Sequence, residues 1–267
     1  MTTLTKKNPI IIEREGEVGT IYLNRPHVRN AMDLEMIRQL TSAFQMLDNE
    51  DEIRIIVLTS KGDNFCSGAD LNWMQSGMNQ TMVQLSKESL ELAGLYRTIW
   101  ESATVTIASV KGKIPGGAIG LLAASDFVVA ERSSSLTFSE VKLGLVPATI
   151  SPYVIRKAGF SRTNDWMMTG RLIESEEAMA AGLIHRICEN GLLPETTKDL
   201  VNELISNAPQ ALMGVKQLLR DLEGETDLDQ EDQFTSQLIA RYRTSEEGQE
   251  GMTAFFEKRK PRWNEKP

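Results

Sequence analysis

Histidine and cysteine are scarce in this sequence of 267 residues, which contains two of each. The histidines, His27 and His185, lie far apart, and so do the cysteines, Cys66 and Cys188. No HExxH or CxxC spacing occurs, and no Gly-x-Ser-x-Gly motif accompanies either histidine. The scarcity argues against a metal site and a Ser-His-Asp triad. It leaves carboxylates and backbone amides for any catalytic chemistry.

Excess positive charge and long apolar runs are also missing. The chain has 29 basic and 37 acidic residues, a formal net charge of −8, which argues against nonspecific binding to nucleic acid or to an anionic membrane surface. No apolar run approaches the ~18 residues of a membrane span. The first residues, MTTLTKKNPI, lack the apolar stretch of a secretory signal. We therefore expect a cytoplasmic protein with no nucleic-acid or membrane partner.

Strand-like and helix-like segments alternate through the first two thirds of the chain. Residues 33–49 carry apolar side chains at helical spacing behind a plausible N-cap, Asp33, and residues 85–99 carry a second helical pattern. Short links between such segments predict an α/β fold with right-handed crossovers. The predicted strands are residues 18–23, 53–60, 105–110, 126–131 and 135–138.

The pattern changes near residue 190, after which only helical periodicity is found. We therefore interpret residues 1–190 as an α/β core and residues 191–267 as a helical C-terminal region. Such a region could cover the core or pack against a second subunit.

Two glycine-containing loops each follow a predicted strand and open a helix. One is IPGGAIGLLAASDF (114–127), with adjacent Gly116 and Gly117, and the other is NFCSGADLNWM (64–74). Either loop alone is explained by a tight turn. Together they could supply two unpaired amides at helix starts, which is what an oxyanion hole needs. Cys66 lies in the 64–74 loop without a histidine to activate it, so we interpret it as a buried side chain.

Several longer motifs carry a family resemblance. FCSGADLNWM, KIPGGAIGLLAASDFVVA, TFSEVKLGLVPATISPYVI and GMTAFFEKRKPRW occur in the order found in the crotonase (enoyl-CoA hydratase/isomerase) superfamily, and LNRPHVRNAM (23–32) is similar to its N-terminal motif. The resemblance covers residues 10 to 263. The variants GADLNWM and GLVPATISPYV are most similar to the methylglutaconyl-CoA and carboxygeranoyl-CoA hydratases.

The resemblance implies a spiral of ββα units with a C-terminal helical trimerisation region. It implies an acyl-CoA thioester as substrate, no separate cofactor because coenzyme A is part of that substrate, no metal, and a homotrimer or a hexamer made of two trimers. It places the thioester oxyanion between the amides of Ala69 and Gly117. Asn72 replaces the family's lysine in the helix that the 64–74 loop opens. The implied CoA-binding residues are Arg25, Ser67, Ala69, Asp70, Leu71, Gly116 and Lys258.

The catalytic positions implied by the resemblance are Glu140, Gly117, Ala69 and Gly120. Aligning Asp126 with the family's aspartate puts Gly120 where many hydratases have a first glutamate, and FSEVKLG supplies the second as Glu140. A glycine there removes a carboxylate and leaves a space of about one side chain, which close packing disfavours. We therefore expect a branched acyl group to fill that space.

Three functions are consistent with these residues. A single carboxylate whose pKa is raised by burial suffices to shift a double bond from the 3- to the 2-position, which favours an isomerase. The neighbouring motifs favour an enoyl-CoA hydratase acting on a branched or glutaconyl-type thioester, which is our prediction. A non-catalytic acyl-CoA-binding protein is the third possibility, and the retained Glu140 argues against it. We interpret Asp126 as the anchor of a strand start and His185 as structural.

Overall fold

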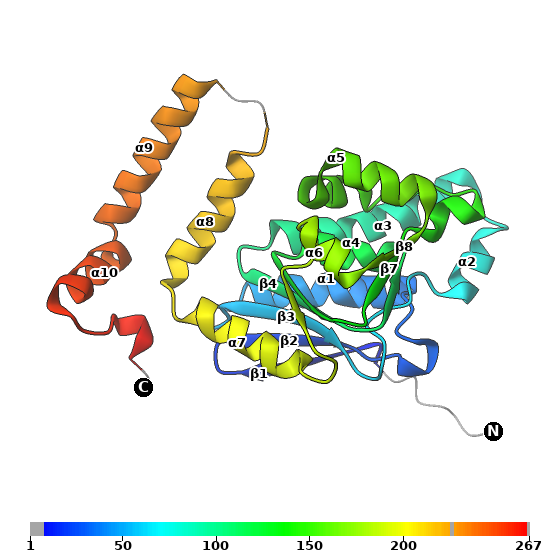
Figure 1. The fold of residues 1–267 in the computed structure, drawn as a ribbon, viewed down its shortest axis with the longest axis horizontal. Coiled ribbons are helices and arrows are strands. Elements are labelled where there is room, and N and C mark those ends of the chain that lie inside the picture. Colours follow the sequence, from blue (N-terminus) through cyan, green and yellow to red (C-terminus); the bar gives the residue numbers. More distant parts are fainter. Residues whose placement is uncertain (1–7, 225–226, 266–267) are drawn as a thin grey trace. The chain divides into compact units, whose positions relative to one another are not determined.

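The computed structural model describes residues 8–224 and 227–265 (Figure 1). The chain forms two compact units, the first ending at Lys198 and the second beginning at Asp199. Every described strand lies in the first unit, and the last of them ends at Cys188.

A six-stranded sheet forms the centre of the first unit, in the order β1-β2-β3-β4-β6-β9. β1 and β2 are antiparallel, and all other neighbours in this sheet are parallel. β4 is buried along its whole length and β3 along most of it, as expected for parallel strands covered on both faces. The strands are β1 (Ile10–Glu15), β2 (Val18–Leu23), β3 (Ile55–Ser60), β4 (Val105–Val110), β6 (Phe127–Glu131) and β9 (Arg186–Cys188).

A smaller sheet contains β5 (Lys113–Pro115), β7 (Ser135–Thr137) and β8 (Leu172–Glu174). The chain alternates between the two sheets: β4 joins the large sheet, β5 the small one, and helix α4 (Gly117–Ala124) follows. β6 and β7 repeat the pattern, followed by the 3-10 helix η2 (Ser139–Leu143) and helix α5 (Ser151–Thr169). These successive units confirm the predicted α/β class and the spiral of ββα turns.

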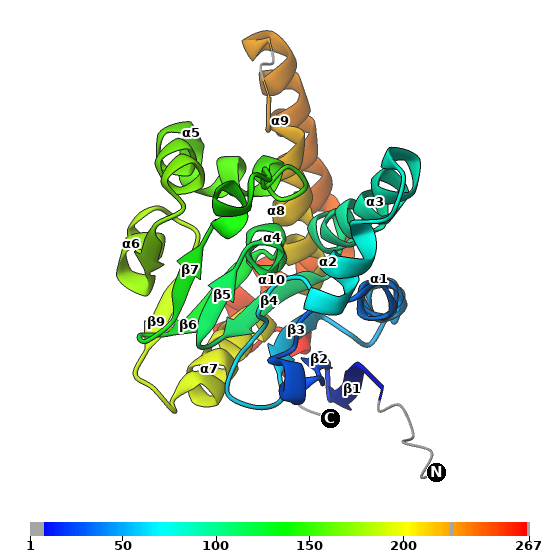
Figure 2. The ribbon, with the colours of Figure 1, turned by 90° about the vertical axis from the view of Figure 1, so that its right-hand side faces the viewer.

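One helix packs against the N-terminal half of the large sheet, and a second helix packs against the first (Figure 2). α1 (Leu34–Asp48) contacts β1, β2 and β3 on one side and α3 (Met82–Glu101) on the other. The predicted N-cap is confirmed, because the Asp33 carboxylate accepts a hydrogen bond of 2.9 Å from the amide of Met36. The buried face of α1 carries Met36, Ile37, Leu40, Ala43, Phe44 and Leu47.

The remaining elements are helical. The first unit also contains η1 (Pro26–Val28), α2 (Leu71–Gly77) and α6 (Ser175–Ala180), and α7 (Leu193–Ile205) crosses the boundary between the units. The second unit continues with α8 (Pro209–Asp221), α9 (Leu228–Thr244), α10 (Glu246–Glu257) and η3 (Arg262–Asn264). Within the described ranges, none of the helices has both the length and the apolar character needed to span a membrane.

Candidate active site

In the loop before α2, the backbone N–H of Ala69 points away from the strand-like pairing that its neighbours make. Ala69 forms an isolated parallel bridge with Met32, in which the amide of Met32 donates to the carbonyl of Gly68 and the amide of Asp70 donates to the carbonyl of Met32, both at 2.8 Å. This pairing uses the groups on either side of Ala69, so its own N–H faces the opposite direction. Among the described residues, no acceptor takes this N–H.

Charged side chains hold that loop in place. The Asp70 carboxylate caps α2 through the amide of Asn72 at 2.9 Å and accepts a hydrogen bond of 3.0 Å from Arg25. The Arg25 guanidinium also donates to the carbonyl of Ala31 at 2.6 Å and lies 3.1 Å from the carboxylate of Asp33. Arg25 thus ties the start of α1 to the start of α2. Its role in binding CoA stays a prediction.

The loop before α4 also has a backbone amide without an acceptor among the described residues. Gly116, with φ 54° and ψ −130°, precedes α4 and donates its amide to the carbonyl of Thr137 at 2.9 Å. The positive φ favours glycine at this position. Gly117 is the first residue of α4, where helix amides have no partner inside the helix. Its N–H has no acceptor within the described parts of the chain.

The two loops lie against each other. A Cβ built on Gly68 would stand 3.0 Å from the carbonyl oxygen of Pro115, two residues before Gly117. Met32, the bridge partner of Ala69, has its Cε 3.7 Å from the place where a Cβ of Gly117 would lie. The structure therefore brings the predicted amides of Ala69 and Gly117 to one place.

Glu140 lies directly over this turn. It sits in η2, and its Oε1 is 3.0 Å from the place where a Cβ of Gly116 would lie, so glycine leaves room for the carboxylate. Its Oε2 is buried and has no hydrogen-bond partner among the described residues. Burial raises the pKa of Glu140, because loss of water disfavours the charged form. This carboxyl group is suited to taking up and returning a proton.

The expected empty space at Gly120 is not present, and that prediction is wrong. A Cβ on Gly120 would meet the ring of Tyr96 at 2.6 Å and Cγ2 of Ile150 at 2.6 Å. Both side chains are buried, so α3 and the residue before α5 already fill the place. A glutamate at 120 would collide with them. Neighbouring side chains, rather than the acyl group, occupy the volume beside Gly120.

The other residues predicted to bind CoA are spread over several elements. Ser67 donates its amide to the carbonyl of Arg29 at 3.0 Å and its hydroxyl to the carbonyl of Val28 at 3.3 Å. Leu71 opens α2 with an exposed side chain. Lys258 is the C-cap that follows α10 in the second unit, with φ 58°. Their roles stay predictions.

Three side chains of types that often catalyse reactions have structural roles here: Asp126, His185 and Cys66. The Asp126 carboxylate accepts from the amide of Thr106 at 2.7 Å and so anchors the start of β6 to β4. Nδ1 of His185 accepts from the amide of Val128 at 3.1 Å, and burial lowers the pKa of His185 to about 4. Burial raises the pKa of Cys66 to about 12, so its thiol stays protonated. The structural interpretations of all three are confirmed.

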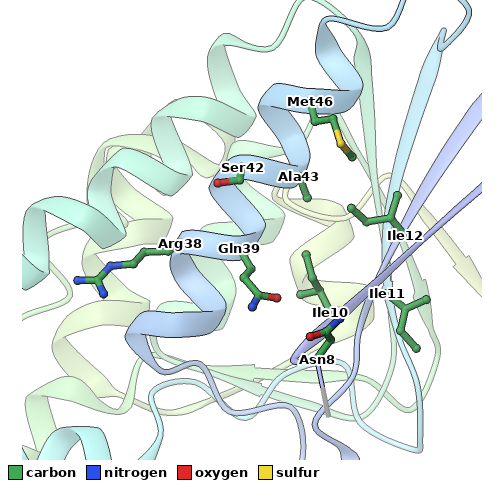
Figure 3. A pocket seen from close by; sticks show the side chains of 9 residues that line it. All are labelled: Asn8, Ile10, Ile11, Ile12, Arg38, Gln39, Ser42, Ala43 and Met46. Atoms are coloured by element: carbon green, nitrogen blue, oxygen red, sulfur yellow. The ribbon is translucent and has the colours of Figure 1, made fainter. Parts of the chain in front are cut away.

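A separate hollow lies between β1 and α1 (Figure 3). Its wall is mostly apolar, with Ile10 and Ile12 on the strand facing Ala43 and Met46 on the helix. Arg38 also lines it and is paired with Glu91 at 2.6 Å. None of the predicted site residues lines this hollow.

The site at the two loops suits chemistry on an activated carbonyl. The amides of Ala69 and Gly117, which donate to no acceptor in the described part of the chain, can hold an oxygen on which negative charge develops. A buried carboxyl group next to them can move a proton to or from the neighbouring carbon. This combination supports reactions at the carbon atoms next to a thioester.

Comparison with known proteins gives a consistent result. The sequence profile described as enoyl-CoA hydratase/isomerase matches residues 13–266. The chain is similar to the crystal structure of an enoyl-CoA hydratase from Shewanella pealeana, at 38% identity and a TM-score of 0.91, with 96% of each chain covered. An enoyl-CoA hydratase of Alternaria alternata is 33% identical over 96% of this chain and 84% of its own length. A short-chain-enoyl-CoA hydratase of Clostridium acetobutylicum is 28% identical over 95% of this chain and 96% of its own length.

Proposed function

Because the chain belongs to the enoyl-CoA hydratase/isomerase family, we propose that it adds water to a 2-enoyl-CoA thioester at the Glu140 site. One observation carries this proposal: Oε2 of Glu140 is buried and has no hydrogen-bond partner within residues 8–224 and 227–265, and the carboxyl group lies over the Gly116–Gly117 turn. Coenzyme A enters as part of the substrate, so the proposal needs no separate cofactor.

The proposed reaction uses one oxyanion site and one carboxylate. The amides of Ala69 and Gly117 bind the thioester oxygen and stabilise the negative charge that develops on it. The oxygen of water forms a bond to C3 while Glu140 takes a proton from that water. Glu140 then delivers a proton to C2, which restores the carboxylate and completes the addition of one water molecule.

One observation favours double-bond migration as a second candidate. At Gly120, where many hydratases of the family have a glutamate, Tyr96 and Ile150 provide no carboxylate. Moving a double bond from C3 to C2 requires only that a proton leave C2 and a proton arrive at C4. Glu140 alone can perform both transfers if it reaches both carbons.

A branched or glutaconyl-type acyl group is our proposal for the substrate. Its support is the similarity of GADLNWM and GLVPATISPYV to the hydratases that act on such thioesters. The packing at Gly120 gives it no support, because that space is filled.

A panel of enoyl-CoA thioesters with product analysis tests the reaction and the acyl group together. We expect the 3-hydroxyacyl product, with kcat/KM higher for 3-methylglutaconyl-CoA than for crotonyl-CoA. This expected preference rests on the motif similarity alone. Equal or better hydration of crotonyl-CoA would reject the acyl preference. A shifted 3-enoyl double bond without water addition would establish the isomerase, and no turnover of any thioester would leave a binding protein.

A trimer, or a hexamer made of two trimers, is our proposal for the assembly. We expect the helical region after residue 191 to hold it, because this region leaves large apolar side chains in contact with water. Phe255 and Phe256 at the end of α10 are 77% and 79% exposed, and Leu219 on α8 is 66% exposed. Light scattering at micromolar concentration should give the mass of three or six chains, whereas a monomer would contradict the proposal.

A further inference from the structure

Tyr96 reaches the oxyanion turn from α3, a different element from those that carry the predicted site. Its hydroxyl donates a hydrogen bond of 2.7 Å to the carbonyl of Gly117. That carbonyl belongs to the same residue whose amide is free to bind the thioester oxygen. The bond therefore acts on the backbone of the donor residue itself.

The tyrosine is held firmly from several sides. Its side chain has no exposed surface, and its ring lies where a Cβ of Gly120 would be, next to Ile150. The ring of Tyr153 on α5 packs edge-on against it, with the centroids 6.1 Å apart. Because the ring is enclosed, the hydroxyl has a fixed position, and it reaches the turn without lining the surface that a substrate touches.

The turn is restrained from more than one direction. Gly116 and Gly117 are adjacent, and glycine is the residue with the greatest backbone freedom. The Gly117 N–H belongs to the 116–117 peptide, whose carbonyl accepts a hydrogen bond of 2.9 Å from the amide of Ile119. The Gly117 carbonyl belongs to the next peptide, and the Tyr96 hydroxyl holds it at 2.7 Å. Because the peptides on both sides of its Cα are held, Gly117 has little freedom to rotate, and its amide is already aimed before the reaction starts. Electrostatic stabilisation of a transition state depends on such prior orientation.

We propose that Tyr96 is a positioning residue of the oxyanion turn: its hydroxyl holds the 117–118 peptide in place and so keeps the Gly117 amide, in the neighbouring 116–117 peptide, pointed at the thioester oxygen. This inference rests on the proposed function of the same site.

The surroundings of Tyr96 keep its hydroxyl protonated, so that it can donate a hydrogen bond. Burial raises its pKa well above the ordinary value, and Glu140, Cys66 and Tyr153 act in the same direction. The phenol is therefore protonated at neutral pH. A change in the pH profile is not expected when the hydroxyl is removed.

The test compares Tyr96→Phe with the matched variant Tyr153→Phe, which removes a hydroxyl from the neighbouring ring. The probe is the CoA thioester of cinnamic acid, a chromophoric enoyl thioester whose absorbance moves to longer wavelength when its carbonyl is polarised. For Tyr96→Phe we expect a smaller shift of the bound probe and a kcat lower by about tenfold, the size of one lost hydrogen bond. KM and the pH of half-maximal activity should stay as in the wild type, and Tyr153→Phe should keep the full shift.

The outcomes separate this inference from the proposed function. A wild type that binds the probe without any shift would reject the oxyanion site and the role of Tyr96 together. A wild-type shift that Tyr96→Phe retains, with kcat unchanged, would overturn the role of Tyr96 and leave the hydratase proposal standing. Tyr96→Leu provides a second variant without a hydroxyl. It should lose part of the shift while circular dichroism reports a folded chain, and an undiminished shift would overturn the role as well.

Discussion

Glu140→Gln is expected to lower kcat by at least about 100-fold, the usual size of a general acid–base contribution. Glutamine keeps the shape of the side chain over Gly116 but cannot take up or return a proton. The carboxyl group is buried and its Oε2 has no described partner, so nothing nearby replaces it. The measurement is steady-state hydration of the best thioester of the panel, with KM followed separately to detect weaker binding.

The pH profile and a second glutamate variant supply the controls. Burial raises the pKa of Glu140 above the usual value for glutamate, and the proposed reaction begins with the carboxylate form. Activity of the wild type should therefore fall as the pH drops through that raised pKa. Glu131→Gln removes another partly buried carboxylate, one that accepts a hydrogen bond of 3.0 Å from the amide of Gly191, and should leave this profile unchanged. Glu140→Gln activity within a few-fold of the wild type would contradict the assignment.

Gly117→Pro is expected to cost about 3 kcal/mol of transition-state stabilisation, the effect of losing one oxyanion donor. Proline deletes the N–H that has no described acceptor, and the first position of a helix is where proline is best tolerated. Turnover should fall, while affinity for coenzyme A, measured by calorimetry with a saturated acyl-CoA, should change little.

Gly117→Ala is the matched control for this change. A Cβ at position 117 would lie 3.1 Å from the Tyr96 hydroxyl and 3.7 Å from Cε of Met32, and both variants introduce this Cβ. Only proline removes the amide. We expect the alanine variant to keep much more activity than the proline variant. Equal activities, or a folded proline variant with full turnover, would remove the Gly117 amide from the site.

The parts of the fold that the sequence predicts well are those with long, clear patterns. Asp33 and the apolar spacing behind it indicate α1 nearly to the residue, and the apolar runs of β3 and β4 mark buried parallel strands. Four strands are missing from the prediction. β1 has six residues, but its sequence IIIERE does not alternate between apolar and polar side chains. β5, β8 and β9 have three residues each, too few to show a period of two. They form only because longer elements bring their backbones together.

The sequence likewise indicates some residues of the site and not others. The glycines and the family motifs indicate the two amides and Glu140, since backbone freedom and a motif are visible in the sequence. The place of Tyr96 beside Gly120 was not visible, because the two residues come from different helices and meet only through packing. The carboxylate partners of Arg25 were missed for a similar reason. Asp70 lies 45 residues further along the chain, and no local pattern joins the two.

The Met32–Ala69 bridge has a consequence for genetic variation at this site. The group that Ala69 would contribute belongs to the backbone, and the bridge aims it through the amides of Met32 and Asp70 and the carbonyls of Gly68 and Met32. Every amino acid except proline carries the same amide, so a codon change at position 69 alters the side chain and leaves the donor. In a saturation library, we expect position 69 to accept small replacements, whereas position 140 accepts none because its chemistry lies in the side chain.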